Sequence, residues 1–269
     1  MISRGEAGAA VRVALKDLAR SVGPAGAWRH PTSGVVLLTA FVIFTLLSFG
    51  PLLKLDGLLN MHLVHDWPQG RVPTKVVVSL GQRAVGLPVL GAVTAYVAWR
   101  RRTWVPVVIT VTSVLALNFV VGVIKLATGR LSPRATANPD CWWQGDILYP
   151  SGHTANIILV YGLAAYLAYH FLGPKSRLAR VMVGLTWFAA VTVTVGIVYL
   201  GGHWFTDLVA GLLMSGVALR GAMSGHRRYL EWQATRPAAP ASGGEETSTT
   251  SQVAAQAGAG ASGSDDSAA

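Results

Sequence analysis

Residues 149–156, with the sequence YPSGHTAN, separate two long apolar stretches of the chain. Pro150 and Gly152 favour a turn, and an apolar helix is predicted to begin directly after His153. A histidine at the rim of an apolar helix needs polar partners from elsewhere, because burying an unpaired polar group is costly. The fold and function can therefore be predicted only after the other segments that lie at the same membrane face as His153 are identified.

Six apolar runs have about the length that a bilayer-spanning helix needs, roughly 20 residues. We expect an all-α, polytopic membrane protein, with six transmembrane helices at 34–53, 84–99, 104–124, 154–172, 181–200 and 205–224. Of the 269 residues, 52% are hydrophobic and 13% are charged, whereas soluble domains carry about 25% charged residues. The chain is therefore predicted to hold a membrane domain at 34–224, between a cytoplasmic segment at 1–33 and a disordered, cytoplasmic tail at 225–269.

Basic residues cluster at alternate ends of the predicted spans. The clusters are Arg12, Lys16, Arg20 and Arg29; Arg100, Arg101 and Arg102; Lys175, Arg177 and Arg180; and Arg220, Arg227 and Arg228. The positive-inside rule makes their side cytoplasmic and leaves 54–83, 125–153 and 200–204 facing outward. The net charge of +10 thus indicates membrane orientation and not a nucleic-acid partner. We expect a multi-pass plasma-membrane protein with both termini in the cytoplasm.

Three short segments on the predicted outward side hold residues that can take part in catalysis. They contribute Lys125, Arg130 and Arg134; then Ser151, Gly152 and His153; then His203 and Asp207. If the sixth helix begins near His203, a carboxylate four residues later lies beside the ring and fixes its tautomer. Residues 150–154 would present backbone N–H groups at a helix start, which attract phosphate. Together with the cations, this set suits phosphoryl transfer through a phosphohistidine.

Structural explanations compete with the catalytic one. A single histidine in a membrane hairpin is more often an interfacial polar residue, which is our interpretation of His62, His65, His170 and His226. Lys125 can extend to the interface from a span end, and Arg130 and Arg134 can bind lipid headgroups. Asp207 is harder to explain in this way, because a carboxylate inside a span is expensive.

Metal and cofactor chemistry are not predicted. A single cysteine, Cys141, excludes an internal disulfide and a cysteine-rich metal site. Two histidines about 50 positions apart with one carboxylate are also a weak metal signature.

These motifs resemble the type-2 phosphatidic acid phosphatase family, whose members are integral-membrane lipid phosphate phosphatases. That family carries Lys-x6-Arg-Pro, then Pro-Ser-Gly-His, then Ser-Arg-x5-His-x3-Asp. The second motif is complete at residues 150–153, and the third keeps His203 and Asp207 within YLGGHWFTD. The resemblance covers roughly 118–215, and the six-span layout extends it to about 34–224.

The resemblance implies a role for each matching residue. His203 would attack phosphorus, Asp207 would orient His203, and His153 would protonate the leaving oxygen and then activate water. Lys125, Ser151 and the N–H group of Gly152 would hold the phosphoryl oxygens, with no metal or cofactor. The partner is then a lipid phosphate in the bilayer.

Two departures from the family pattern concern arginines. Ser132 stands where the first motif has arginine, and Gly196 and Ile197 stand where the third has Ser-Arg. Arginine suits phosphate because it makes paired hydrogen bonds, and losing one transition-state donor costs about a hundred- to a thousandfold in rate. Arg130 and Arg134 flank Ser132 and are candidates to replace the first lost arginine.

The sequence leaves several functions open. The leading hypothesis is a metal-independent phosphatase acting on phosphatidic acid, phosphatidylglycerol phosphate or a polyprenyl (di)phosphate. The family also resembles vanadium-dependent haloperoxidases, but these are soluble and six apolar spans argue against that chemistry. A non-catalytic lipid-phosphate binder is the main alternative, favoured by Ser132 and Ile197. A transporter is disfavoured because the polar residues gather at one rim and not at mid-membrane.

Overall fold

The computed structural model describes residues 32–59 and 67–235. All regular elements in these ranges are helices, which confirms the all-α prediction. The long ones are α3 (Thr32–Ser48), α7 (Arg83–Arg101), α8 (Val105–Thr128), α9 (Gly152–Leu172), α10 (Arg177–Tyr199) and α11 (Phe205–Ala234). The short ones are α4 (Leu53–Leu59), η1 (Pro68–Gly70), α6 (Arg71–Val78) and η2 (Ser79–Gly81).

Four to six spans are supported in the described part of the chain. The helices α8, α9, α10 and α11 are each long and apolar enough to cross a membrane. Two further spans arise if bent pairs of helices count as one: α3 with α4, bent by 79°, and residues 68–81 with α7, bent by 45°. The prediction of a multi-pass membrane protein is confirmed.

The predicted helix ends need two corrections. The first span was expected to reach residue 53, but α3 ends at Ser48. The sequence Phe49-Gly50-Pro51 breaks it, because proline has no N–H and disfavours helical geometry in the residue before it. Helix α11 continues to Ala234, so residues 225–234 of the predicted disordered tail are helical. The remaining predicted terminal segments, together with His62 and His65, lie outside the described residues.

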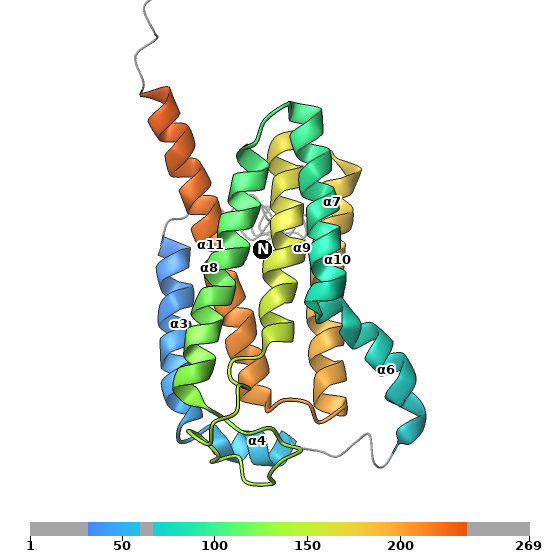
Figure 1. The fold of residues 1–269 in the computed structure, drawn as a ribbon, viewed down its shortest axis with the longest axis vertical. Helices are drawn as coiled ribbons and strands as arrows, with labels where there is room; N and C mark the ends of the chain where they lie inside the picture. The colour runs from blue at the N-terminus through green and yellow to red at the C-terminus, as the bar shows by residue number, and fades with distance from the viewer. Residues whose placement is uncertain (1–31, 60–66, 236–269) are drawn as a thin grey trace, which may run out of the picture. The chain divides into compact units, whose positions relative to one another are not determined.

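Helix α9 is the most enclosed helix of the described bundle. It packs against α7, α8 and α10, and most of its residues are buried (Figure 1). Helix α11 also touches it, since a Cβ atom on Gly162 of α9 would lie 2.9 Å from the Leu219 side chain. Outer helices instead expose large apolar side chains, for example Leu46, Leu115, Phe119 and Val195. Such exposed apolar surface is what a lipid-facing helix requires.

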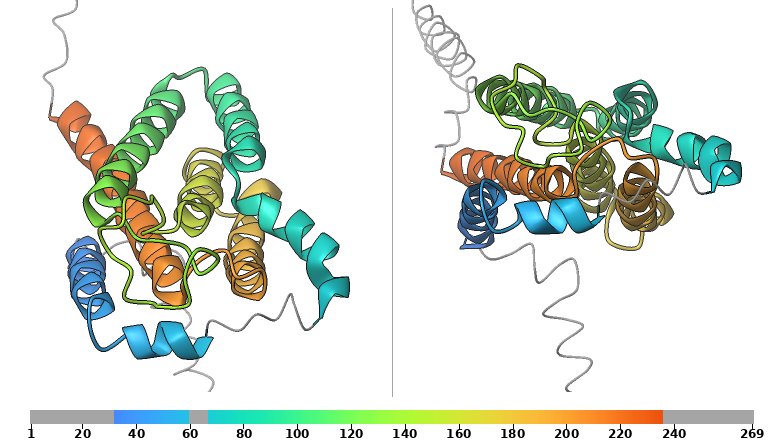
Figure 2. Two further views of the ribbon diagram at one scale, coloured as in Figure 1. Left: turned by 60° about the horizontal axis from the view of Figure 1, so that its bottom comes forward. Right: turned by 90° about the horizontal axis from the view of Figure 1, so that it is seen from below.

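Described parts of the three predicted outward segments lie together at one end of this bundle. The last turn of α8, the 129–151 loop, the start of α9 and the α10–α11 turn lie together at the lower end in Figure 1, beside α4 (Figures 1 and 2). The loop folds back onto α8, because Trp143 N donates to Thr128 O and Gln144 N to Gly129 O, both at 2.8 Å. Gly129 makes this return possible: its φ is +52°, and a Cβ there would lie 3.2 Å from Trp143 Cα.

Candidate active site

His203 and Asp207 are paired at the start of α11. The helix begins at Phe205, so His203 precedes it and is not within its first turn. Asp207 nevertheless reaches back: its Oδ2 accepts hydrogen bonds from the backbone N of Trp204 at 3.1 Å and from His203 Nδ1 at 3.3 Å. The bond from Trp204 is the reverse half of a capping box. Because an ionised carboxylate can only accept, Nδ1 carries a proton, and in the neutral ring Nε2 of His203 keeps its lone pair.

The start of α9 is fastened to the start of α11. Ser151 N donates to Asp207 O at 2.9 Å, and Thr154 Oγ1 donates to Leu208 O at 3.0 Å. Gly211 permits this approach, because a Cβ there would lie 2.2 Å from Thr154 Oγ1. His153, one residue before Thr154, is therefore held in a fixed position relative to α11.

These contacts bring the two histidines of the motifs together. The ring centroids of His153 and His203 are 6.1 Å apart, with an interplanar angle of 73°. A nucleophile approaches phosphorus at about 3–3.5 Å, and a general acid hydrogen-bonds the leaving oxygen at about 2.6–3.2 Å. The separation of the rings is therefore of the size that one phosphoryl group between them requires.

The first turn of α9 has hydrogen-bond donors to offer. Ser151 occupies the N-cap position, yet its side chain makes no capping hydrogen bond. Ser151 Oγ is buried and has no hydrogen-bond partner among the described residues. The hydroxyl and the N–H of Gly152, the first residue of α9, lie next to His153 in the chain, where a helix start favours an anion.

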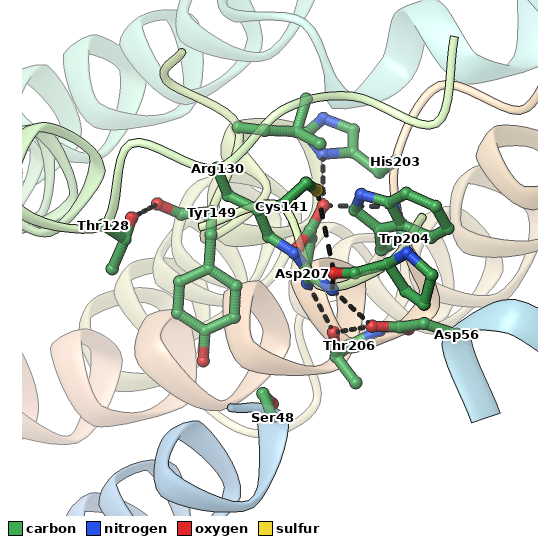
Figure 3. Close-up of polar contacts among 12 residues, drawn as sticks. Ser48, Asp56, Thr128, Arg130, Cys141, Tyr149, His203, Trp204, Thr206 and Asp207 are labelled. Atoms are coloured by element: carbon green, nitrogen blue, oxygen red, sulfur yellow. Dashed lines mark hydrogen bonds and ion pairs between the residues drawn. The ribbon is translucent and has the colours of Figure 1, made fainter. Parts of the chain in front are cut away.

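Arg130 is not free to bind substrate in this structure. Its side chain is fully buried, and its guanidinium lies between two carboxylates, with Nη1 2.6 Å from Asp207 Oδ1 and Nη2 2.7 Å from Asp56 Oδ2 (Figure 3). Burial alone would lower the pKa of Arg130, but Asp207 and Asp56 together raise it above its ordinary value. The residue predicted as a phosphate ligand thus contacts the back of Asp207, away from the oxygen that accepts from His203.

Asp56 of α4 is a residue that the sequence analysis missed. It is 1% exposed, and its Oδ1 accepts from Thr206 N at 2.9 Å. Its Oδ2 accepts from Thr206 Oγ1 at 2.6 Å as well as from Arg130 (Figure 3). The available signal was the aspartate inside the apolar run LKLDGLL, because a carboxylate buried in such a run must be paired.

Lys125 and Arg134 also lie at this end of the bundle. Lys125 Nζ donates to the carbonyl oxygens of Ile147 and Leu148, which leaves one of its three donors unused by these bonds. Arg134 is exposed, and its Nη2 donates to Leu200 O at 3.0 Å in the turn that leads to His203. Ile197, at the position of the lost motif arginine, is buried and faces that turn, since a Cβ on Gly202 would lie 3.5 Å from its side chain.

A second group of histidines lies elsewhere on the same two helices. His170 in the last turn of α9 and His226 of α11 have ring centroids 4.6 Å apart, and Tyr166 Oη is 2.8 Å from His226 Nδ1. Within the described residues, neither this group nor the His153–His203 pair forms part of a cluster of three or more His, Cys, Asp or Glu residues suited to a metal.

Comparison with known proteins agrees with the motifs. The model of the PAP2 superfamily matches residues 106–230, which contain both motif histidines and Asp207. We refer to the matched residues 106–230 as the PAP2 segment. The resemblance found in the sequence, to type-2 phosphatidic acid phosphatases, is thereby confirmed. This PAP2 segment begins in α8, so α3, α4 and α7 precede it.

The fold is also shared with a solved PAP2 structure. It is described as the first transmembrane PAP2-type phosphatidylglycerolphosphate phosphatase from Bacillus subtilis, and the match has a TM-score of 0.57 at 21% sequence identity. It covers 74% of this chain and 98% of that one. No curated protein matches this chain.

Proposed function

We propose that this protein is a membrane lipid phosphate phosphatase that works through a phosphohistidine. The observation that carries the proposal is the His153–His203 pair, 6.1 Å apart, with Asp207 bonded to Nδ1 of His203. The PAP2 assignment of residues 106–230 and the shared fold with a PAP2 phosphatase support it. The substrate would be a phosphomonoester or diphosphate of a lipid, such as phosphatidic acid, phosphatidylglycerol phosphate or a polyprenyl (di)phosphate.

The first chemical step would transfer the phosphoryl group to the protein. The Nε2 lone pair of His203 attacks phosphorus, and the bond from phosphorus to the lipid oxygen breaks. His153 gives its proton to that oxygen, which leaves as the lipid alcohol or, from a diphosphate, as the lipid monophosphate. Asp207 stabilises the positive charge that develops on the His203 ring as the N–P bond forms.

The second step would return His203 to its starting state. His153, now neutral, takes a proton from a water molecule as the water oxygen attacks phosphorus. The N–P bond breaks, its electron pair returns to Nε2, and inorganic phosphate is released. His153 is again protonated, so one turnover consumes one water and leaves the protein unchanged.

Phosphate binding is assigned to Lys125, Arg134, Ser151 and Gly152. The buried hydroxyl of Ser151 and the N–H of Gly152 lie beside His153, and Lys125 has a donor left. Arg134 is bonded to the turn before His203, which supports it as the replacement for the missing arginines. We assign Arg130 differently: with its guanidinium held between two carboxylates, it supports Asp207 and does not contact phosphate.

The proposed mechanism needs no metal ion. The attacking group is a neutral imidazole nitrogen, and the phosphoryl charge is balanced by Lys125, Arg134 and the start of α9. We therefore propose that the enzyme is metal-independent. We also place its site on the outer face of a plasma membrane, which rests on the basic clusters at the opposite span ends.

The second candidate is a non-catalytic binder of lipid phosphates. It is favoured by Ser132 and Ile197, which stand where the family has arginine, because each lost arginine removes donors from the transition state. Such a binder would keep the cationic and helix-start contacts, and its affinity would not depend on His203.

Phosphate release by the purified protein in detergent distinguishes the two. The substrates are phosphatidic acid, phosphatidylglycerol phosphate and a polyprenyl diphosphate, each with and without EDTA. We expect release that survives EDTA, disappears in His203→Ala and is retained in His170→Ala, an exposed histidine of α9. No release from any lipid, with binding unchanged in His203→Ala, would establish the binder instead.

A further inference from the structure

A buried carboxylate from outside the PAP2 segment reaches the candidate active site. Asp56 belongs to α4, about 50 residues before the matched residues begin. Both of its oxygens are bonded to residues of that segment, namely Arg130 and Thr206 (Figure 3). The contact with Thr206 N satisfies a first-turn donor of α11, which its own helix leaves without a partner.

The charges in this group form an ordered row. Asp56, Arg130 and Asp207 have fully buried side chains, and the guanidinium lies between the carboxylates at 2.7 and 2.6 Å. Asp207 Oδ2, the other oxygen of the second carboxylate, accepts from His203 Nδ1. One cation is thus shared by two anions, and the last anion is in contact with the proposed nucleophile.

This sharing decides how much negative charge Asp207 presents to His203. Paired with Arg130 alone, Asp207 would have its charge largely neutralised, because opposite charges at contact distance in a buried site interact strongly. Asp56 offsets part of the guanidinium charge, so the three groups together present a net negative charge to the imidazole. Asp207 can then stabilise the positive ring that forms when phosphorus binds to Nε2.

We propose that Asp56 is a positioning residue of the phosphatase site: it holds the guanidinium of Arg130 against Asp207 and offsets part of its positive charge, so that the group beside His203 keeps a net negative charge. The inference rests on the proposed function for its catalytic meaning. Its electrostatic part can be tested without enzymatic activity, because it concerns the affinity of His203 for a proton. Asp56 itself touches neither the nucleophile nor the substrate.

The direct test is the protonation of His203 in the full-length protein. Diethyl pyrocarbonate modifies only neutral imidazole, so the pH dependence of His203 modification, followed by peptide mass spectrometry, gives a midpoint. The other titratable groups near His203 are Asp207 on α11, His153 on α9, Lys125 at the end of α8 and Arg134, which is bonded to the preceding turn, and they are unchanged in the variant. Asp56→Asn removes one negative charge and keeps the side-chain shape, so the midpoint should move to lower pH.

Asp140→Asn is the matched control, because it makes the same chemical change at an exposed position of the outer loop. We expect its midpoint to equal that of the wild type. If Asp56→Asn does not give monodisperse protein, Asp56→Ser removes the same charge and leaves room for a water molecule, and the same shift is expected. An unmoved midpoint in folded uncharged variants would overturn the proposal.

Kinetics supply the second readout. For wild type that releases phosphate, Asp56→Asn should lower kcat about 10- to 100-fold, with KM changed less than about threefold, since the affected interaction is made in the transition state. The acidic limb of the pH profile of kcat/KM should move to lower pH with the modification midpoint. An inactive wild type whose midpoint still shifts would refute the phosphatase and retain the role of Asp56. An active wild type whose midpoint is unchanged in Asp56→Asn would support the phosphatase and overturn the role of Asp56.

Discussion

Helices α9 and α11 carry or adjoin two pairs of histidines, and the pairs differ in what surrounds them. At the start of the helices, His203 donates to a buried carboxylate and lies 6.1 Å from His153. Toward their other ends, His226 meets the neutral hydroxyl of Tyr166 and stacks on Phe171, 4.6 Å from His170. The second pair is the closer one, but it lacks a charged partner for its bonded nitrogen.

The contrast shows that proximity does not make a histidine a nucleophile. A carboxylate on Nδ1 stabilises a ring that becomes positive, whereas a tyrosine hydroxyl cannot. The first pair is also beside a helix start and a buried serine hydroxyl, which favour an anion. The second pair lies among the aromatic rings of Tyr166 and Phe171. Chemistry is therefore expected at one end of these helices and packing at the other.

Exchanging one histidine at each end should have very unequal effects. We expect His153→Gln to lower kcat for phosphate release by about 10²–10⁴-fold, because glutamine cannot transfer a proton to the leaving oxygen. His170→Gln, at the exposed position of the other pair, should change kcat less than threefold. Steady-state kinetics on the best lipid substrate measures both. Equal losses in the two variants would remove the functional distinction between the pairs.

The two loop arginines allow a second comparison, of stability against rate. Arg130→Gln leaves two buried carboxylates without their cation and should destabilise the protein by about 3–5 kcal/mol. Arg134→Gln alters an exposed side chain, so its stability should stay within about 0.5 kcal/mol, while its kcat falls at least tenfold. Denaturation in detergent and phosphate release together test the assignment. A stable but inactive Arg130→Gln would indicate instead that Arg130 binds phosphate.

Two glycines of α11 differ in how closely other atoms approach them: Gly211 lies against the start of α9, and Gly225 has open space around it. Gly211→Ala would bring Cβ to 2.2 Å from Thr154 Oγ1 and 2.6 Å from Ser151 O, so α9 must shift. We expect a loss of about 1–3 kcal/mol in stability together with lower activity. Gly225→Ala, beside His226, meets nothing within 4 Å and should be neutral or stabilising by up to about 1 kcal/mol. Thermal unfolding of both variants decides, and similar behaviour would contradict the described packing of α9 on α11.

Hydropathy predicted the long helices well because length and apolarity alone determine them. Helices α8, α9 and α10 end within about four residues of their predicted bounds, whereas the break after Ser48 depended on Gly50-Pro51, which an apolar average conceals. The His203–Asp207 contact followed from a spacing of four, and it exists although α11 begins after His203.

The role of Arg130 was the part that the sequence could not supply. A basic residue within the first family motif suggests phosphate, and nothing in its neighbours along the chain points to Asp56, which is 74 positions away. Local patterns identify a residue's chemistry, but its partner depends on how distant segments pack. The same holds for Arg134, whose contact with Leu200 spans 66 positions.

The position of α4 limits how far the protein can be truncated from its N-terminus without losing contacts of the candidate active site. The described residues up to Arg227 lie in one compact unit, and the carboxylate of α4 is bonded to the backbone of α11 within it. A fragment limited to the PAP2 segment would expose Arg130 on the side of Asp56 and leave the Thr206 N–H without an acceptor. The segment that matches the family model therefore lacks the acceptor of Arg130 and of the Thr206 N–H, and a fragment meant to keep these contacts must include α4.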